Sequence, residues 1–351
     1  MFCVWNLFLF NEEGREIYMK MNKIINNPDD IISDMLEGYL YLHQDLYKHV
    51  AGTMGGMIKK QQQEKVTILI GGGGGNEPWC LGYVGQGLSD GMISGNVYTA
   101  PPAKSILDVS KEIYNEKGIL YIGTNHMGDV LNFELVGELA ELENIHTRCV
   151  FVNDDIASDL NNPEERRGVA GIALAVKMAG AASEKGLDLE GTTKITQKAI
   201  DNLRTLSVTT SPGYMPANGK PMCDMEEGII EYGMGFNGEP GILKQPLKTA
   251  KEIVTTMMDV LMETWDYQQE ELGVFLNGFG FTSIIELHIV MKEIKNYAKE
   301  KGINIYHADV KNAFCPQGAG GFSISLIKLD EELKPYYNYR AESPLLRFKQ
   351  L

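Results

Sequence analysis

Five consecutive glycines, Gly71–Gly75, follow the apolar, β-branched run Lys65–Ile70 and precede Asn76. The run predicts a strand, so the glycines are expected to begin a loop where that strand ends. Because glycine has no side chain, such a loop lets the backbone approach a ligand closely and presents N–H groups to it. The loop matches neither a P-loop nor the Gly-x-Gly-x-x-Gly pattern. It predicts a small-ligand site, with a tight strand-to-helix crossover as an equal alternative.

Asp129 stands just past a second predicted strand, Gly118–Thr124. Ligands of α/β sheets bind at the carboxyl ends of strands, and a carboxylate there can accept a proton from a hydroxyl group. The alternative is an N-cap for a predicted helix over Val130–Leu142, and the residues alone favour the cap. His126 is the one histidine that lies beside another candidate residue.

Three further groups carry weaker signals. Asp154 and Asp155 follow a predicted strand over Thr147–Val152, but two adjacent carboxylates are few for a metal, so a capped turn is favoured and no metal site is predicted. The pair Arg166–Arg167 could clamp an anion or form a solvated turn. Trp79 is expected to pack in the core.

Composition excludes several classes of function. The chain has 351 residues, enough for about two domains, and a net charge of −15. That charge argues against binding to nucleic acid or to an anionic membrane surface. Its five cysteines are scattered without a Cys-x-x-Cys pair, which favours reduced thiols in a cytoplasm over a zinc site or a disulfide framework.

Predicted strands alternate with predicted helices, which indicates an α/β fold with a mainly parallel sheet. Besides the strands named above, strands are expected at 273–277, 303–308 and 322–328, helices at 27–47, 169–185, 192–206, 249–264 and 283–301, and a loop at 54–65.

Three segments are expected along the chain. Residues 1–18 are interpreted as an extension or a mis-called start, because Met1–Phe10 is apolar, short and without a basic flank, and Met19 offers a second start. Residues 19–206 form a first α/β domain with the glycine loop and Asp129. Residues 207–351 form a second, because Ser207–Pro221 is rich in proline, glycine and hydroxyl residues.

Several of these motifs resemble one family, the substrate-binding subunit DhaK of dihydroxyacetone kinases. The matching segments keep the order of the family's motifs over about residues 23–330. They are the following, with the family motif in parentheses after some of them: Gly71–Pro78 with Gly82–Gly87 (Gly-Gly-Gly-Ser-Gly-His-Glu-Pro…Gly-Tyr-x-Gly-x-Gly), Gly128–Phe133 (Gly-Asp-x-Leu-Asn-Phe), Asp154-Asp155 with Arg166–Gly171, Gly235–Ile242 (Gly-Ile-His-Gly-Glu-Pro-Gly-Ile), Leu276–Gly280 and Gly321–Leu326.

The resemblance implies a homodimer of two-domain α/β subunits, with mainly parallel or mixed sheets flanked by helices. It implies a small ketose or polyol of the dihydroxyacetone (glycerone) class as substrate, held covalently as a hemiaminal by a histidine. Asp129 matches the family's catalytic aspartate, and Gly73, Gly74 and Gly75 match loop residues expected to hold substrate oxygens. No cofactor is expected in this chain. ADP or ATP with Mg is expected on a separate DhaL-like subunit, recharged by a DhaM-like phosphotransferase-system donor.

Three positions depart from the family pattern: Asn76 and Asn237 replace histidines, and Thr124 replaces a lysine. An amide nitrogen has its lone pair delocalised, so Asn237 cannot form a stable hemiaminal, and Asn76 cannot act as an acid or base. All three are expected to contact substrate, and His126 is a candidate replacement base.

Three interpretations therefore remain open. One is a phosphotransferase subunit that binds non-covalently, with impaired or altered activity. Another is a sugar-sensing regulator that acts through a protein partner, such as a transcription regulator. The third is a structural subunit with an empty pocket.

Overall fold

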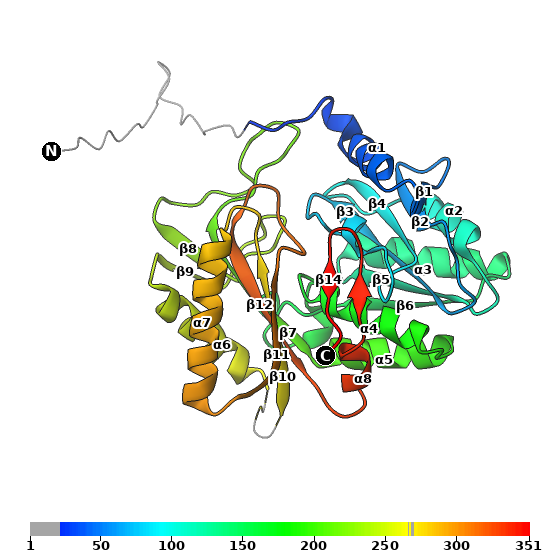
Figure 1. Ribbon diagram of the computed structural model, residues 1–351. Coiled ribbons are helices and arrows are strands. Elements are labelled where there is room, and N and C mark those ends of the chain that lie inside the picture. The colour runs from blue at the N-terminus through cyan, green and yellow to red at the C-terminus, as the bar shows by residue number, and fades with distance from the viewer. Residues whose placement is uncertain (1–21, 266, 268–269) are drawn as a thin grey trace, which may run out of the picture.

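The computed structural model describes residues 22–265, 267 and 270–351, which form two six-stranded mixed sheets with helices packed against them (Figure 1). The predicted extension over residues 1–18 lies outside the described residues. Among the described residues, no helix combines the length and apolar character that crossing a membrane requires.

The first sheet has the strand order β1-β2-β4-β3-β5-β6. Strands β4, β3, β5 and β6 run parallel to one another, and β2, antiparallel to β4, and β1, antiparallel to β2, complete the other edge. Its strands are β1 (Tyr47–His49), β2 (Gly55–Lys59), β3 (Thr67–Gly74), β4 (Gly91–Val97), β5 (Ile119–Thr124) and β6 (Thr147–Val152), and its helices are α1 (Ile31–Leu42), α2 (Ala103–Ile113), α3 (Met127–Leu142), α4 (Ile172–Glu184) and α5 (Leu189–Asp201). Gly71–Gly74 belong to β3 and pair with β4, so the prediction that these glycines form a loop is wrong, and the loop begins at Gly75. Because β3 and β5 are parallel neighbours, the glycines and the segment after Thr124 lie at the same end of the sheet.

Both faces of β3 are buried. Ile68 and Ile70 pack in the same hydrophobic cluster as the alanines of α4, whereas Leu69 packs on the other face with residues of α2 and α3. A parallel strand covered on both sides is expected to be continuously apolar, as this run is. Helix α4 is itself buried along almost its whole length, and a Cβ at Gly180 would clash with the backbone of Gly87.

The second sheet has the order β11-β10-β12-β7-β8-β9, and only β10 and β11 are parallel. Its strands are β7 (Leu203–Ser211), β8 (Ile229–Tyr232), β9 (Leu243–Pro246), β10 (Glu271–Gly278), β11 (Asn304–Lys311) and β12 (Gly320–Lys328), with helices α6 (Ala250–Glu263) and α7 (Ile284–Lys301). Both helices begin with a capping box, Thr249 with Glu252 and Ser283 with Glu286, which satisfies N–H groups that the first turn leaves free.

The chain returns to the first sheet after β12. The segment holds α8 (Lys334–Tyr337) and the hairpin of β13 (Ala341–Glu342) and β14 (Arg347–Phe348), and Glu342 pairs with Gln86. The buried ammonium of Lys177, on α4, donates to the backbone carbonyls of Tyr336, Tyr337 and Tyr339. The C-terminal segment thus ties the two halves together, and the division of the chain at 206/207 stays a prediction.

Two further predicted elements are wrong. The predicted helix 192–206 ends at Asp201, and the β-branched residues that follow form β7, which pairs with β12 more than a hundred residues later. The predicted loop 54–65 contains β2, in which Gly55 pairs with Ser94 so closely that a Cβ would lie 2.6 Å from its carbonyl oxygen. Both strands depend on distant partners that local residue preferences do not reveal. The expectation of a mainly parallel sheet holds for the first sheet alone.

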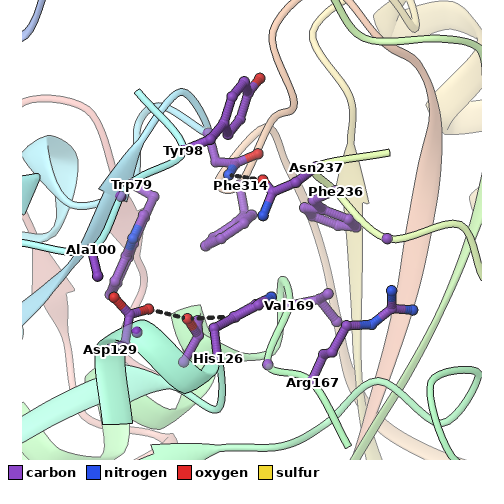
Figure 2. A pocket seen from close by; sticks show the side chains of 16 residues that line it. Trp79, Tyr98, Ala100, His126, Asp129, Arg167, Val169, Phe236, Asn237 and Phe314 are labelled. Atoms are coloured by element: carbon purple, nitrogen blue, oxygen red, sulfur yellow. Dashed lines mark hydrogen bonds between the residues drawn. The ribbon is translucent and has the colours of Figure 1, made fainter. Parts of the chain in front are cut away.

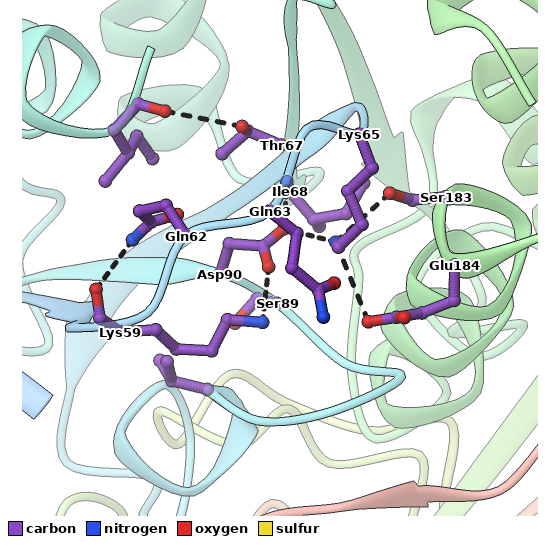
Figure 3. Close-up of polar contacts among 12 residues, drawn as sticks. Lys59, Gln62, Gln63, Lys65, Thr67, Ile68, Ser89, Asp90, Ser183 and Glu184 are labelled. Atoms are coloured by element: carbon purple, nitrogen blue, oxygen red, sulfur yellow. Dashed lines mark hydrogen bonds and ion pairs between the residues drawn. The ribbon is translucent and has the colours of Figure 1, made fainter. Parts of the chain in front are cut away.

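An ion cluster stabilises the amino-terminal end of the parallel strands (Figure 3). Asp90 is 3% exposed and accepts hydrogen bonds from Lys65 Nζ at 2.8 Å and from Ile68 N at 2.9 Å, and it lies 2.5 Å from Lys59 Nζ. Lys65 also donates to Ser183 of α4. Every charge in this cluster has a partner, as a buried carboxylate requires.

Candidate functional site

A cavity of about 190 Å³ lies between the two halves, at the carboxyl ends of β3 and β5 (Figure 2). It is much smaller than the roughly 300–1,000 Å³ of pockets for drug-sized ligands, so it suits a small molecule. Its lining comes from strands β3 and β5, α3 and the loops beside them, from the turn before α4, and from the second half of the chain. These residues are Gly73, Asn76, Trp79, Tyr98, Ala100, Thr124, His126, Gly128 and Asp129, then Arg167, Gly168 and Val169, and then Gly235, Phe236, Asn237 and Phe314.

The glycine run, which forms the end of β3 and the start of the loop after it, contributes less of the wall than expected. Gly73 lines the cavity, and a Cβ there would lie 2.8 Å from Thr99 N, so only glycine fits without displacing the backbone. Gly74 and Gly75 are not lining residues. The N–H of Gly75 is used within the loop, where it donates to Glu77 Oε1 at 2.9 Å.

Asp129 lies in the first turn of α3 rather than at its N-cap, which is His126. The interpretation of Asp129 as a helix cap is therefore wrong. Its carboxylate instead accepts a hydrogen bond from Thr124 Oγ1, with 2.8 Å from that oxygen to Oδ2. Thr124 Oγ1 is also 2.9 Å from His126 Nδ1, so the three side chains form one hydrogen-bonded row, drawn with dashed lines in Figure 2.

Burial sets the electrostatics of this row. Asp129 is 5% exposed, no cation pairs with it among the described residues, and burial raises its pKa to about 7 against the opposing hydrogen bond from Thr124. Its second oxygen, Oδ1, is buried without a hydrogen-bond partner. Burial also lowers the pKa of His126; Glu239 opposes this effect and Arg167 adds to it. An acid and a base with pKa values displaced toward each other are typical of proton-transfer sites.

The two asparagines meet across the cavity from different halves of the molecule. Asn76 Nδ2 is 3.4 Å from Asn237 Oδ1, and Asn76 Oδ1 is buried without a partner. The backbone holds both residues: Asn76 O accepts from Cys315 N, and Asn237 N donates to Glu239 Oε2 at 3.0 Å. One unpaired amide oxygen therefore belongs to the cavity wall.

Aromatic rings close the remaining wall. Trp79 is buried and packs against Phe314 with 5.7 Å between ring centroids, and Phe314 packs against Phe236 at 5.2 Å. Trp79 thus packs in the core, as predicted, but one of its faces also lines the cavity. Phe236, Phe314 and Tyr98 were missed at the sequence level; Phe236 alone carried a signal, because it immediately precedes Asn237.

The Asp-Asp and Arg-Arg pairs have structural partners. Asp154 accepts from the N–H groups of Val169 and Gly171, and Arg167 Nη2 donates to Asp155 Oδ2 at 2.8 Å. Arg166 is 3% exposed, so the solvated-turn alternative is wrong for it. These contacts hold the turn that carries Gly168 against the cavity. Within the described ranges, no group of three or more His, Cys, Asp or Glu side chains has the arrangement of a metal site.

The family model of the Dak1 domain matches residues 37–345. The chain belongs to the Dak1 domain family. It is 34% identical over 330 residues to the dihydroxyacetone-binding subunit DhaK of a phosphotransferase-system-dependent dihydroxyacetone kinase of Listeria innocua, covering 93% of this chain and 99% of that protein.

Two solved structures share the fold of this Dak1 domain. A dihydroxyacetone kinase operon co-activator, DhaQ, superposes with a TM-score of 0.83 and 25% identity, covering 88% of this chain and 96% of that one. The dihydroxyacetone kinase of C. freundii, in complex with AMP-PNP and Mg²⁺, superposes with a TM-score of 0.86 and 25% identity, covering 94% of this chain but 61% of that one. The expected DhaK-like α/β fold is confirmed.

Proposed function

We propose that this Dak1 domain binds a small ketose or polyol of the dihydroxyacetone class non-covalently, as the substrate subunit for phosphoryl transfer from a separate nucleotide-bearing subunit. ADP or ATP with Mg belongs to that partner in this proposal, and a phosphotransferase-system protein recharges it. The proposal extends the dihydroxyacetone binding of the Listeria relative to this chain.

One observation carries the proposal: two cavity residues, Asp129 and Asn76, each have a buried oxygen without a hydrogen-bond donor. Unpaired buried acceptors are costly, and a ligand that donates hydrogen bonds removes this cost. Two acceptors in so small a cavity fit a short molecule with at least two hydroxyl groups. The aromatic wall would cover its C–H surface, as in many sugar-sized sites.

Non-covalent binding follows from the chemistry of the lining side chains. The amide of Asn237 stands where the family resemblance implies a histidine, and it is not a nucleophile toward a ketone. His126 has its Nδ1 engaged by Thr124, which leaves Nε2 as the one imidazole nitrogen of the cavity without a hydrogen bond to the described residues. We assign Asp129 and His126 the acid–base work on the substrate hydroxyl.

Calorimetry with intact-protein mass spectrometry tests this binding mode. Titration with dihydroxyacetone, glycerol and tetroses should release heat reversibly and leave the protein mass unchanged. Asn237→His is the matched variant, because it introduces an imidazole and should then show a mass adduct with dihydroxyacetone. An adduct on the unaltered chain would contradict the non-covalent mode, and absence of heat with every triose and tetrose would contradict the ligand class.

A second candidate is a non-catalytic regulator that senses a sugar and acts through a protein partner. The likeness to the operon co-activator favours it. Turnover of a short-chain ketose in the presence of a nucleotide-bearing subunit and its phosphoryl donor supports the kinase function. If no triose or tetrose is turned over while Asp129→Ala still binds a regulator, the second candidate is the correct one.

A further inference from the structure

The row of side chains His126, Thr124 and Asp129 is built by one short stretch of chain. Thr124 is the last residue of β5, His126 is the N-cap of α3, and Asp129 lies in the first helical turn. The N–H of His126 donates to the carbonyl of Thr124 at 2.7 Å, which fixes the turn between strand and helix. The local backbone therefore sets the two side-chain distances, 2.9 Å and 2.8 Å, on either side of the Thr124 hydroxyl.

A hydroxyl group has a single proton, which determines how the row can be arranged. When Asp129 is ionised, Thr124 donates to Oδ2, so His126 must donate from Nδ1 and its Nε2 carries a lone pair. When Asp129 is protonated, it donates to Thr124, which then donates to Nδ1, and the proton of His126 resides on Nε2. The two arrangements differ by one proton, which enters or leaves the row at His126 Nε2. Both keep the two hydrogen bonds of the Thr124 hydroxyl, so the row can take up and release this proton without moving a heavy atom.

We infer that Thr124 is a proton bridge that joins His126 and Asp129 into one acid–base unit. This inference rests on the proposed function for its substrate. In the forward step, His126 Nε2 takes the proton of the substrate hydroxyl, Nδ1 passes its proton to Thr124 Oγ1, and Thr124 passes its own to Asp129 Oδ2. The substrate oxygen keeps the electron pair of its O–H bond and forms the bond to phosphorus, while the bond between phosphorus and the partner's nucleotide breaks.

The surroundings isolate the bridge from other proton carriers. Thr124 is 4% exposed, and Gly168 packs so tightly against it that a Cβ there would lie 2.9 Å from Thr124 Cβ. The charged groups that face His126 are Glu239 and Arg167, and Arg167 is paired with Asp155. Cys80 is the titratable group that senses the charge of Asp129, and burial raises its pKa, so it stays a neutral thiol.

Displaced pKa values support the exchange. Burial raises the pKa of Asp129 to about 7 and lowers that of His126, so Asp129 is a better proton acceptor relative to His126 than an ordinary carboxylate is. Both shifts favour movement of a proton along the row from the imidazole toward the carboxylate.

The test is a nitrogen-15 NMR titration of His126 in the free full-length protein, compared across Thr124→Val, Thr124→Ser, Asp129→Asn and the double variants. Valine keeps the shape of threonine without the hydroxyl, and serine keeps the hydroxyl. With Thr124 in place, Asp129→Asn should lower the pKa of His126 by about one unit, a tenfold fall in proton affinity. Combined with Thr124→Val, this effect should shrink to less than about a third, and combined with Thr124→Ser it should persist.

Two results would overturn the bridge. One is an undiminished effect of Asp129→Asn after Thr124→Val, because simple Coulomb attraction does not need the hydroxyl. The other needs no variant: if Asp129 is ionised and His126 shows a bare Nδ1, the required tautomer is absent. Both measurements are made without substrate, so their failure is distinct from failure of the proposed function.

A kinetic measurement separates the bridge from a merely structural threonine. With a nucleotide-bearing subunit present, Thr124→Val should lower kcat by about 100-fold while the ligand Kd changes by less than about threefold, and Thr124→Ser should recover most of the rate. Equal losses in kcat and affinity, with no recovery by serine, would contradict a role in proton transfer.

Discussion

Asp90 and Asp129 are both buried carboxylates of the first sheet, yet their pKa values are displaced in opposite directions. Burial by itself raises the pKa of Asp90, but the ammonium groups of Lys65 and Lys59 outweigh burial and hold it below its usual range. Burial raises the pKa of Asp129 to about 7 because its one partner is the neutral hydroxyl of Thr124.

The difference follows from the two ends of the parallel strands. Asp90 precedes β4 at the amino-terminal end, where Lys65 before β3 and Lys59 on β2 reach it (Figure 3). Asp129 follows β5 at the carboxyl end, beside the cavity. At the amino-terminal end of the strands, the buried charges neutralise one another and stabilise the fold. At the carboxyl end, Asp129 has no counter-charge among the described residues, which is typical of carboxylates that exchange protons.

The largest expected effect is a loss of folding stability when the ion cluster at the amino-terminal end of the strands is broken. Asp90→Asn keeps the shape but leaves the largely buried Lys59 without a counter-charge among the described residues and Lys65 with Glu184 alone, 3.9 Å away, so the free energy of unfolding should fall by about 3–5 kcal/mol. Denaturant unfolding at pH 7 measures this loss. Lys48→Ala, which removes a solvent-exposed pair with Glu112, is the control and should cost less than about 1 kcal/mol. Similar losses of stability for the two variants would show that the buried Asp90 cluster contributes no more than the exposed pair of Lys48 and Glu112.

Asp129→Asn should change the free energy of unfolding in the opposite direction. A group whose pKa is raised on folding makes the protein most stable when the group is protonated in both states, and this stability is lost as the pH rises through the folded pKa. Removing the charge should therefore stabilise the fold at pH 8 by on the order of 2–4 kcal/mol and have little effect near pH 4. The same variant should abolish turnover. Destabilisation at pH 8 would mean that the ionised carboxylate of Asp129 makes favourable contacts that outweigh the cost of its burial.

The smallest of the expected effects is that of Thr124→Val on the pKa of Asp129. The hydrogen bond from Thr124 favours the ionised carboxylate, so its loss should raise the pKa of Asp129 above about 7, by roughly one unit or less. Carbon-13 NMR of the Asp129 carboxyl group against pH measures the change, with Thr124→Ser as the control that keeps the bond. A lower pKa in the valine variant would imply that water enters the site and solvates the carboxylate.

Elements with strong local signals were predictable from the sequence. Ser283 and Glu286, which form a capping box, and Gly302, with its left-handed φ of 70°, bound α7 close to the predicted limits. Strands β5 and β6 were predicted from their apolar, β-branched runs; β5 is buried along its whole length, and β6, at the edge of the sheet, is buried only in part. Strand β7 was mistaken for helix because it directly follows the helical segment ending at Asp201, and its pairing with β12 is not encoded locally.

The sequence by itself determined the family and singled out the glycine run and the candidate site residues, because ordered motifs need no knowledge of distant contacts. Only the tertiary structure decided which residues meet. Asn76 and Asn237 lie 161 residues apart in the chain but share a hydrogen bond, and Phe314 comes from further still. The structure also decided that Asp129 has Thr124 rather than a helix end as its partner, because burial and the absence of a counter-charge among the described residues depend on the packing of both halves.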